Sequence, residues 1–131
     1  AYEIRQIKSA VIANYQYFMK PGLTWSTLSS KNFSIRWFDE GYIFDNGGCC
    51  IFDLEEKRRY VIALLNSNVF KFIFSQLNPT LNFQSGEVAK FPVIYKPDNQ
   101  IDALAQHNVT LSKTEYDCFE TSWDFKRHPL I

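Results

Sequence analysis

A turn signal at residues 45–48, flanked by two apolar segments, constrains the fold of this chain more than any other feature. The turn reads Asp45-Asn46-Gly47-Gly48. An Asn-Gly pair supplies the positive φ angles that a tight hairpin turn demands. The apolar segments 41–44 and 49–52 lie on either side of it. We therefore expect an antiparallel hairpin over residues 41–52, with Gly47 required by its backbone conformation.

Residues 33–38, before this turn, alternate apolar and polar side chains, which predicts a second strand. Over residues 33–38, Phe33, Ile35 and Trp37 alternate with polar residues, which is typical of a half-buried strand with Arg36 facing outward. The stretch 24–30 is rich in hydroxyl side chains and follows Pro21-Gly22, so it is expected to be a loop. Residues 1–19 fit helical and extended spacing equally well, and both alternatives stay open.

Apolar residues at helical spacing predict two successive helices near 54–66 and 68–77. A break at Asn66-Ser67-Asn68 separates them, and Pro79 stops the second. Asp53 is expected to cap the first helix.

The remainder of the chain alternates turns and helical patterns. Residues 80–93 predict short strands and turns around Gly86 and Pro92. A helix near 99–108 follows, capped by Asp98 or Asn99. A capping box at Ser112 and Glu115 predicts one more short helix. These elements indicate an α+β fold, a single domain over residues 1–131 with a small, mainly antiparallel sheet packed by helices.

The composition limits what the chain does. Fourteen basic residues balance fourteen acidic ones, so the formal net charge is zero, whereas a domain that grips nucleic acid unaided is usually strongly basic. Cys49, Cys50 and Cys118 are interpreted as buried thiols, and His107 and His128 lack metal-ligand spacing, so no metal site is expected. With no signal peptide and no apolar run long enough for a bilayer, we expect a cytoplasmic location and no membrane partner.

No catalytic residue is predicted. The carboxylates Asp53, Glu55 and Glu56 are interpreted as the solvated start of a helix. Neither histidine has a recognisable acid or base partner in the sequence, and no nucleophile-elbow pattern is present. Trp25 and Trp123 are expected to anchor the core.

Three stretches resemble BREX-type adenine-specific DNA methyltransferases of phage defence, which are related to restriction-methylation enzymes with a TaqI-like specificity domain. The two specific stretches are Leu77-Asn78-Pro79-Thr80-Leu81-Asn82-Phe83-Gln84-Ser85-Gly86-Glu87-Val88 and the Glu120 to Phe125 end of Asp117-Cys118-Phe119-Glu120-Thr121-Ser122-Trp123-Asp124-Phe125. Leu64-Leu65-Asn66-Ser67 precedes the first of them, but a hydrophobic helix that ends in Leu-Asn-Ser occurs widely. The third is Tyr17-Phe18-Met19-Lys20-Pro21-Gly22-Leu23-Thr24-Trp25-Ser26.

The resemblance implies that this chain is the target-recognition region of a larger DNA methyltransferase. In that family an upstream domain binds S-adenosylmethionine and transfers methyl through an Asn-Pro-Pro-Tyr type motif. Asn78-Pro79-Thr80-Leu81 lacks the second proline and the aromatic residue, and is interpreted as a helix stop followed by a turn. Gly47-Gly48 lacks the spacing of a cofactor loop. We expect no cofactor in this chain and S-adenosylmethionine in the parent enzyme.

The resemblance also implies double-stranded DNA as a partner, together with the upstream methyltransferase domain and other defence-system proteins. Side chains with paired donors and acceptors suit the reading of base edges. Two clusters qualify, which are Thr24, Ser26, Ser29, Ser30 and Lys31 with Arg36, and Asn82, Gln84 and Ser85 with Lys90. Solvated loop residues, or a turn network that fixes the helix-to-strand junction, are the structural alternatives.

Two other functions compete with DNA reading. Zero net charge and many aromatic residues also suit a protein-interaction or scaffold domain that docks the methyltransferase to partner proteins. A nuclease is disfavoured, because no constellation of metal-binding carboxylates is evident.

Overall fold

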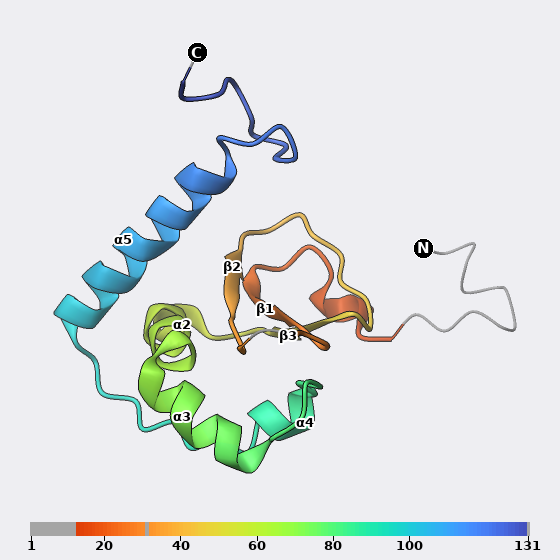
Figure 1. The fold of residues 1–131 in the computed structure, drawn as a ribbon, viewed down its shortest axis with the longest axis vertical. Coiled ribbons are helices and arrows are strands. Elements are labelled where there is room, and N and C mark those ends of the chain that lie inside the picture. The colour runs from red at the N-terminus through yellow and green to blue at the C-terminus, as the bar shows by residue number, and fades with distance from the viewer. Residues whose placement is uncertain (1–12, 31, 131) are drawn as a thin grey trace, which may run out of the picture.

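The centre of the fold is β1 (Gly22–Ser26), which pairs with an antiparallel neighbour on each side in the order β2-β1-β3. The computed structural model describes residues 13–30 and 32–130, and Figure 1 shows the arrangement. β2 spans Arg36–Phe38 and β3 spans Gly48–Ile51. Residues 1–12, most of the stretch for which helix and strand stayed open, lie outside the described part. Tyr15–Tyr17 forms the 3-10 helix η1.

Helices complete the α+β arrangement that the sequence predicts. A 3-10 turn η2 (Glu55–Lys57) leads into α2 (Arg58–Asn66), which is followed by α3 (Asn68–Leu77), the short α4 (Ser85–Val88) and α5 (Asn99–Tyr116). α2 and α3 meet at the predicted break, where the Ser67 hydroxyl accepts a hydrogen bond from the Phe70 amide at 3.1 Å and caps α3. Asp98 caps α5 as predicted, with its carboxylate accepting from the Gln100 and Ile101 amides.

The predicted hairpin over residues 41–52 is wrong in its pairing. β3 begins after the turn as expected, but its partner is β1, with Leu23 opposite Ile51 and Ser26 opposite Gly48. Residues 41–44 form no strand, and the Met19 amide instead donates to the Tyr42 carbonyl at 2.9 Å. The turn is closed by the Asp45 carboxylate, which accepts from the Gly47 amide at 2.8 Å. Among the described glycines only Gly41 has positive φ, so Gly47 is not held in that conformation.

β1 itself falls in a stretch that was expected to be a loop. Its hydroxyl residues disguise a strand alternation in which Leu23 and Trp25 are buried while Thr24 and Ser26 face the other side. Leu23 lies opposite Trp37 of β2, in line with the predicted alternation of residues 33–38.

Four local predictions, about caps, strands and the core, also fail. Asp53 has a φ of 55° and makes no side-chain cap; η2 begins after Leu54, and Asp53 instead pairs with Lys20 at 3.7 Å. The capping box at Ser112 starts no new helix, because α5 runs without a break to Tyr116. Residues 80–93 contain α4 and one isolated bridge rather than strands. Trp25 anchors the core as expected, whereas Trp123 is fully exposed.

The core is an aromatic cluster between the sheet, α2 and α3. Phe33 is at its centre, with ring centroids 5.1 Å from Phe70, 5.5 Å from Phe83 and 5.7 Å from Trp25. Burial of such rings is the main source of stability in a domain of this size.

One cation ties α2 to the sheet. The Arg58 guanidinium lies 3.3 Å from the centre of the Trp37 ring and donates to the carbonyls of Gly22 and Phe38. Burial lowers the pKa of Arg58, and nearby Asp39 offsets part of that effect.

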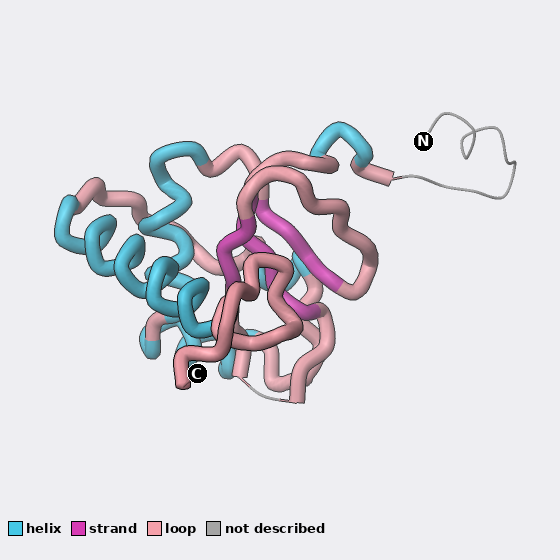
Figure 2. Tube along the Cα trace, turned by 90° about the horizontal axis from the view of Figure 1, so that it is seen from above, coloured by secondary structure: helices cyan, strands magenta, loops and turns pink. Residues whose placement is uncertain are grey.

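α5 lies against α2. Ala105 is buried in the core, while Arg59 of α2 donates to Gln106 at 3.0 Å. In Figure 1 α5 runs from the far left to a point above β2, where the irregular C-terminal tail begins, and in Figure 2, seen from above, this tail overlaps the strands.

Candidate nucleic-acid interface

The two clusters of candidate reading residues lie side by side, joined by a bridge between Leu28 and Asn82, which are 54 positions apart in the sequence. Directly after β1 the chain bends at Thr27 and pairs antiparallel with residues 81–83, with a bridge between Leu28 and Asn82. The Phe83 amide donates to the Thr27 carbonyl at 2.6 Å, and the Ser29 amide donates to the Leu81 carbonyl at 3.2 Å. This pairing joins the loop after β1 to the segment before α4.

The Trp25 side chain strengthens the same junction from inside. Its indole Nε1 donates to the Phe83 carbonyl at 2.7 Å, and both residues are buried. A buried indole N–H needs such a partner, because an unpaired one costs about 1–3 kcal/mol. The relative position of the two clusters is therefore fixed by buried hydrogen bonds.

Three of the candidates meet at a small surface hollow of about 50 Å³, which is large enough for water but not for a base. Ser26, Ser29 and Arg36 contribute to its wall. Phe33, Phe83 and the exposed Ser34 complete the wall. Ser34 was not among the predicted site residues. Its position between the apolar residues Phe33 and Ile35 nevertheless indicated that its side chain faces outward.

Arg36 is exposed at the start of β2, and its neighbour Ile35 is held firmly. The Asn66 side chain accepts from the Ile35 amide at 3.0 Å and donates to the Ile35 carbonyl at 2.9 Å. Within the described part of the chain, the Arg36 guanidinium has no hydrogen bond or ion pair. A free guanidinium on a rigid backbone is suited to bidentate contact with an acceptor pair.

Asn82 and Gln84 are exposed on either side of the buried Phe83. The Gln84 amide donates to the Asn82 side-chain oxygen at 3.0 Å. This leaves further donors and acceptors on both amides, because each amide group offers two donors and two lone pairs.

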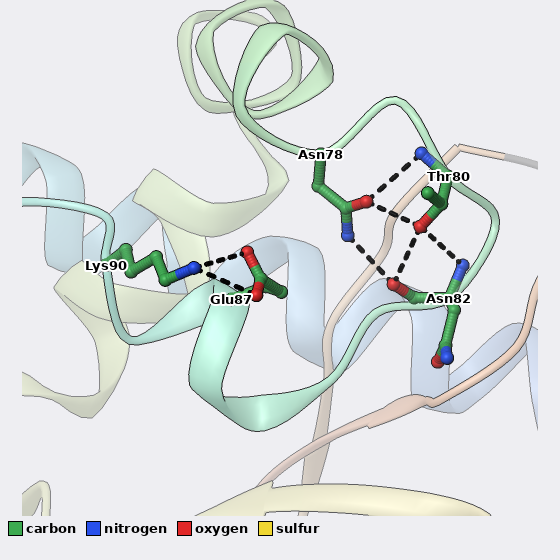
Figure 3. A network of polar contacts seen from close by, with 5 residues as sticks. All are labelled: Asn78, Thr80, Asn82, Glu87 and Lys90. Carbon is green, nitrogen blue, oxygen red and sulfur yellow. Dashed lines mark hydrogen bonds and ion pairs between the residues drawn. The ribbon is translucent and has the colours of Figure 1, made fainter.

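A turn network fixes the backbone of Asn82 (Figure 3). Asn78 is buried; its side-chain oxygen accepts from the Thr80 amide at 3.1 Å and the Thr80 hydroxyl at 2.6 Å, and its nitrogen donates to the Asn82 carbonyl at 2.8 Å. The side chain of Asn82 points away from this network. Asn78-Pro79 is thus a helix stop with a turn, as predicted, and Asn78 and Thr80 also position the Asn82 backbone, a role that the sequence did not assign to them.

The other candidates are placed less favourably for contact. The Thr24 hydroxyl donates to the Cys49 carbonyl at 3.0 Å, and Lys90 makes two contacts of 2.9 Å with the Glu87 carboxylate, which Figure 3 shows on the other side of α4 from Asn82. Ser30 and Ser85 are exposed. Lys31 lies outside the described residues.

The Cys50 thiol lies beside Thr24, one of the candidate residues. Burial raises the pKa of the Cys50 thiol, and the neighbouring Thr24 opposes this only in part, so the thiol stays protonated near neutral pH. Among residues 13–30 and 32–130, no group of three or more His, Cys, Asp or Glu side chains could hold a metal ion. The arrangement is suited to hydrogen-bonded recognition.

The length and hydropathy of the helices bear on whether they could cross a bilayer. Within the described residues, no single helix is both long and apolar enough to cross a membrane. Residues 55–66 and 68–77 together have the length and apolar composition of a membrane span, but the two segments are bent by 68° relative to each other. Only length and composition support such a span.

Known proteins with similar sequences share one enzymatic activity in their names. Over 132 residues and 98% of this chain, 37% of positions are identical to the adenine-specific methyltransferase BrxX of Escherichia coli O9:H4 (strain HS). Over 119 residues and 90% of the chain, 29% are identical to the adenine-specific methyltransferase PglX of Lacticaseibacillus casei (strain Zhang). The chain spans only 11% and 10% of the length of these relatives. No protein-family model matches it.

Proposed function

We propose that this chain, which is homologous to a segment of the BREX-type adenine-specific methyltransferases, is the part of such an enzyme that reads the DNA target sequence. The parent enzyme would bind S-adenosylmethionine and transfer the methyl group in a domain outside this segment, in the cytoplasm where the DNA lies. The segment itself would contribute recognition and no catalytic residue. Double-stranded DNA and the methyltransferase domain of the same polypeptide would be its partners.

The observation that carries this proposal is the pairing of residues 27–29 with 81–83, which joins two separate clusters of polar side chains into one surface. Arg36 suits the paired acceptors of guanine, while Asn82 and Gln84 suit the donor and acceptor of adenine. All three are exposed, and the backbone beneath them is held by buried or half-buried hydrogen bonds. Rigid support of exposed polar groups favours recognition, because little ordering entropy is lost on binding.

A protein-docking role is the second candidate, and an apolar face on α3 favours it. Val69 and Phe72, three residues apart on α3, are 63% and 71% exposed and lie on the side of the helix that faces away from buried Phe70 and Phe74. If docking is the sole role, the target sequence should not depend on Arg36, Asn82 or Gln84. The experiment below therefore separates the two candidates.

The test is to measure methylation by the full-length enzyme on a library of DNA site variants after Arg36→Ala, Asn82→Ala or Gln84→Ala. Loss of a base-reading side chain should cost about 1–3 kcal/mol at one base position and relax specificity there. Loss of a phosphate contact should instead weaken methylation about equally on every sequence.

Matched controls are available on helices away from this surface. Arg59→Ala, Asn108→Ala and Gln100→Ala remove the same side-chain types from exposed positions on α2 and α5, and should leave the sequence preference unchanged. If all three reader variants keep the parental preference at the parental rate, the proposal fails at these residues and the docking role gains support.

A further inference from the structure

The turn after α5 is held by a network of charged and hydroxyl side chains. Lys113 forms ion pairs with Asp124 at 2.6 Å and Asp117 at 3.2 Å. The Ser122 hydroxyl donates to Asp117 at 2.6 Å and accepts from the Asp124 amide at 3.1 Å. Four side chains thus lock the segment on both sides of Trp123.

The result of this network is a Trp123 side chain that is 102% exposed. Tyr116 and Phe119, at the end of α5 and just beyond it, are 57% and 55% exposed. An indole in water forgoes the roughly 2–3 kcal/mol that burial of a large apolar side chain contributes, and aromatic residues are enriched at the centres of protein interfaces. A rigid turn that carries an exposed indole has the properties of an interface anchor, because its conformation is set before binding.

We propose that the Trp123 turn, residues 116–125, docks into an apolar pocket with a basic rim on another part of the same polypeptide. The inference rests on one element of the proposed function, namely that the chain is a segment of a larger methyltransferase. The two relatives are about ten times as long as the aligned segment, so most of such a polypeptide lies outside these residues and offers a surface to dock on.

Charge argues for a protein surface rather than DNA as the occupant. Residues 113–124 contain one basic residue against four acidic ones, a net charge of −3. The hydrogen bond from Ser122 and the contact with Lys113 lower the pKa of Asp117, so this carboxylate is ionised at neutral pH. Lys126 and Arg127 come later, beyond the turn. Phosphates would be repelled by this segment, whereas basic side chains around a pocket would be attracted.

The experiment is hydrogen–deuterium exchange of the full-length methyltransferase, without DNA, compared between the parent protein and Trp123→Ala. We expect exchange to rise several-fold both in the turn and in one second segment outside the present 131 residues, because the docked pocket is released. Trp123→Phe should give an intermediate rise, since a smaller ring fills part of the pocket. Ile94→Ala, which alters a side chain that is 83% exposed elsewhere, is the matched control and should change neither segment.

Affinity for a fluorescein-labelled duplex and the methylation sequence preference are measured on the same variants. Unchanged exchange outside the chain in Trp123→Ala would overturn the proposal. A several-fold loss of duplex affinity without that exchange change would also overturn it and would assign the indole to DNA. The DNA-reading role is tested separately, because it depends on the sequence preference of the Arg36, Asn82 and Gln84 variants and not on exchange.

Discussion

Two glycines show how far residue identity alone predicts a conformational requirement. Gly47 was expected to be essential because Asn-Gly favours positive φ, yet the Asp45 carboxylate organises the turn and Gly47 does not adopt that conformation. Gly22, which the sequence analysis used only as part of the Pro21-Gly22 turn signal, lies in the central strand against both neighbours. Its requirement is steric and comes from tertiary packing, which the local sequence does not encode.

Gly22→Ala should therefore destabilise the chain. An added Cβ would lie 2.6 Å from the Ile51 carbonyl oxygen and 2.8 Å from the Phe38 ring, so strands or side chains must shift, at a cost of about 1–3 kcal/mol. Gly86→Ala is the matched control; its Cβ meets nothing within 4 Å, and alanine in α4 should be neutral or stabilise by up to about 1 kcal/mol. Thermal or urea unfolding measures both. Equal midpoints for Gly22→Ala and the parent would contradict the packing of β1.

At the scale of elements, helices were predicted better than strand pairings. α2 and α3 follow from apolar periodicity and the break between them, and α5 begins at its predicted cap. These signals are local, within a turn or two of helix. The pairing of β3 with β1 depends on which strand can offer a buried, alternating partner far away in the sequence. β1, with Leu23 and Trp25 buried, offers this partner to β3, whereas residues 41–44 do not pair with β3.

One connection between elements explains why the break after α2 contains asparagine. Asn66 ends α2, and both polar atoms of its amide hold the backbone of Ile35, immediately before β2. The stretch Leu64-Leu65-Asn66-Ser67, part of the resemblance to the methyltransferases, thus has a structural role. It caps α3 and positions the strand that carries Arg36.

Asn66→Ala should destabilise the chain by about 1–3 kcal/mol, because the Ile35 amide and carbonyl lose their partners in a half-buried position. Asn66→Asp should not restore stability, since a carboxylate cannot donate to the Ile35 carbonyl. Asn68→Ala, two residues away and exposed, is the control and should stay within about 0.5 kcal/mol of the parent. Urea unfolding is the measurement. A full rescue by Asn66→Asp would show that the Nδ2 bond contributes nothing.

At the scale of the whole molecule, residue chemistry predicted which side chains could read DNA, and the fold determined which of them lie together. Arg36, Asn82 and Gln84 were chosen for their donor and acceptor geometry, and all are exposed. Their assembly depends on the pairing of Thr27 with Phe83, a non-local contact with no signature in either segment. For Trp123 the residue type did not predict the location. The sequence around an aromatic residue is the same whether its side chain enters the core or stays exposed for an interface, and Trp123 is exposed.

The balance of charge over the whole chain sets its expected behaviour on DNA. The net charge is zero, Lys90 is paired with Glu87, and the cations near the candidate surface are Arg36 and Lys71 among the described residues. The isolated chain should therefore bind a DNA duplex weakly, with a Kd of about 1–100 μM, as for non-specific binding. The upstream methyltransferase domain would have to supply most of the phosphate contacts.

The salt dependence of that binding carries the prediction further. Each neutralised phosphate contributes a slope of about −0.9 to log K against log salt, so the two cations Arg36 and Lys71 should give a slope of about −2. Fluorescence anisotropy with a labelled duplex at several salt concentrations measures both quantities, and Arg36→Ala should reduce the slope by about 1 because one cation is lost. Arg59→Ala, on α2 and away from the candidate surface, should leave it unchanged. Nanomolar affinity, or affinity that does not change with salt, would mean that this segment binds DNA tightly by itself. That result would contradict the prediction that the upstream methyltransferase domain supplies most of the phosphate contacts.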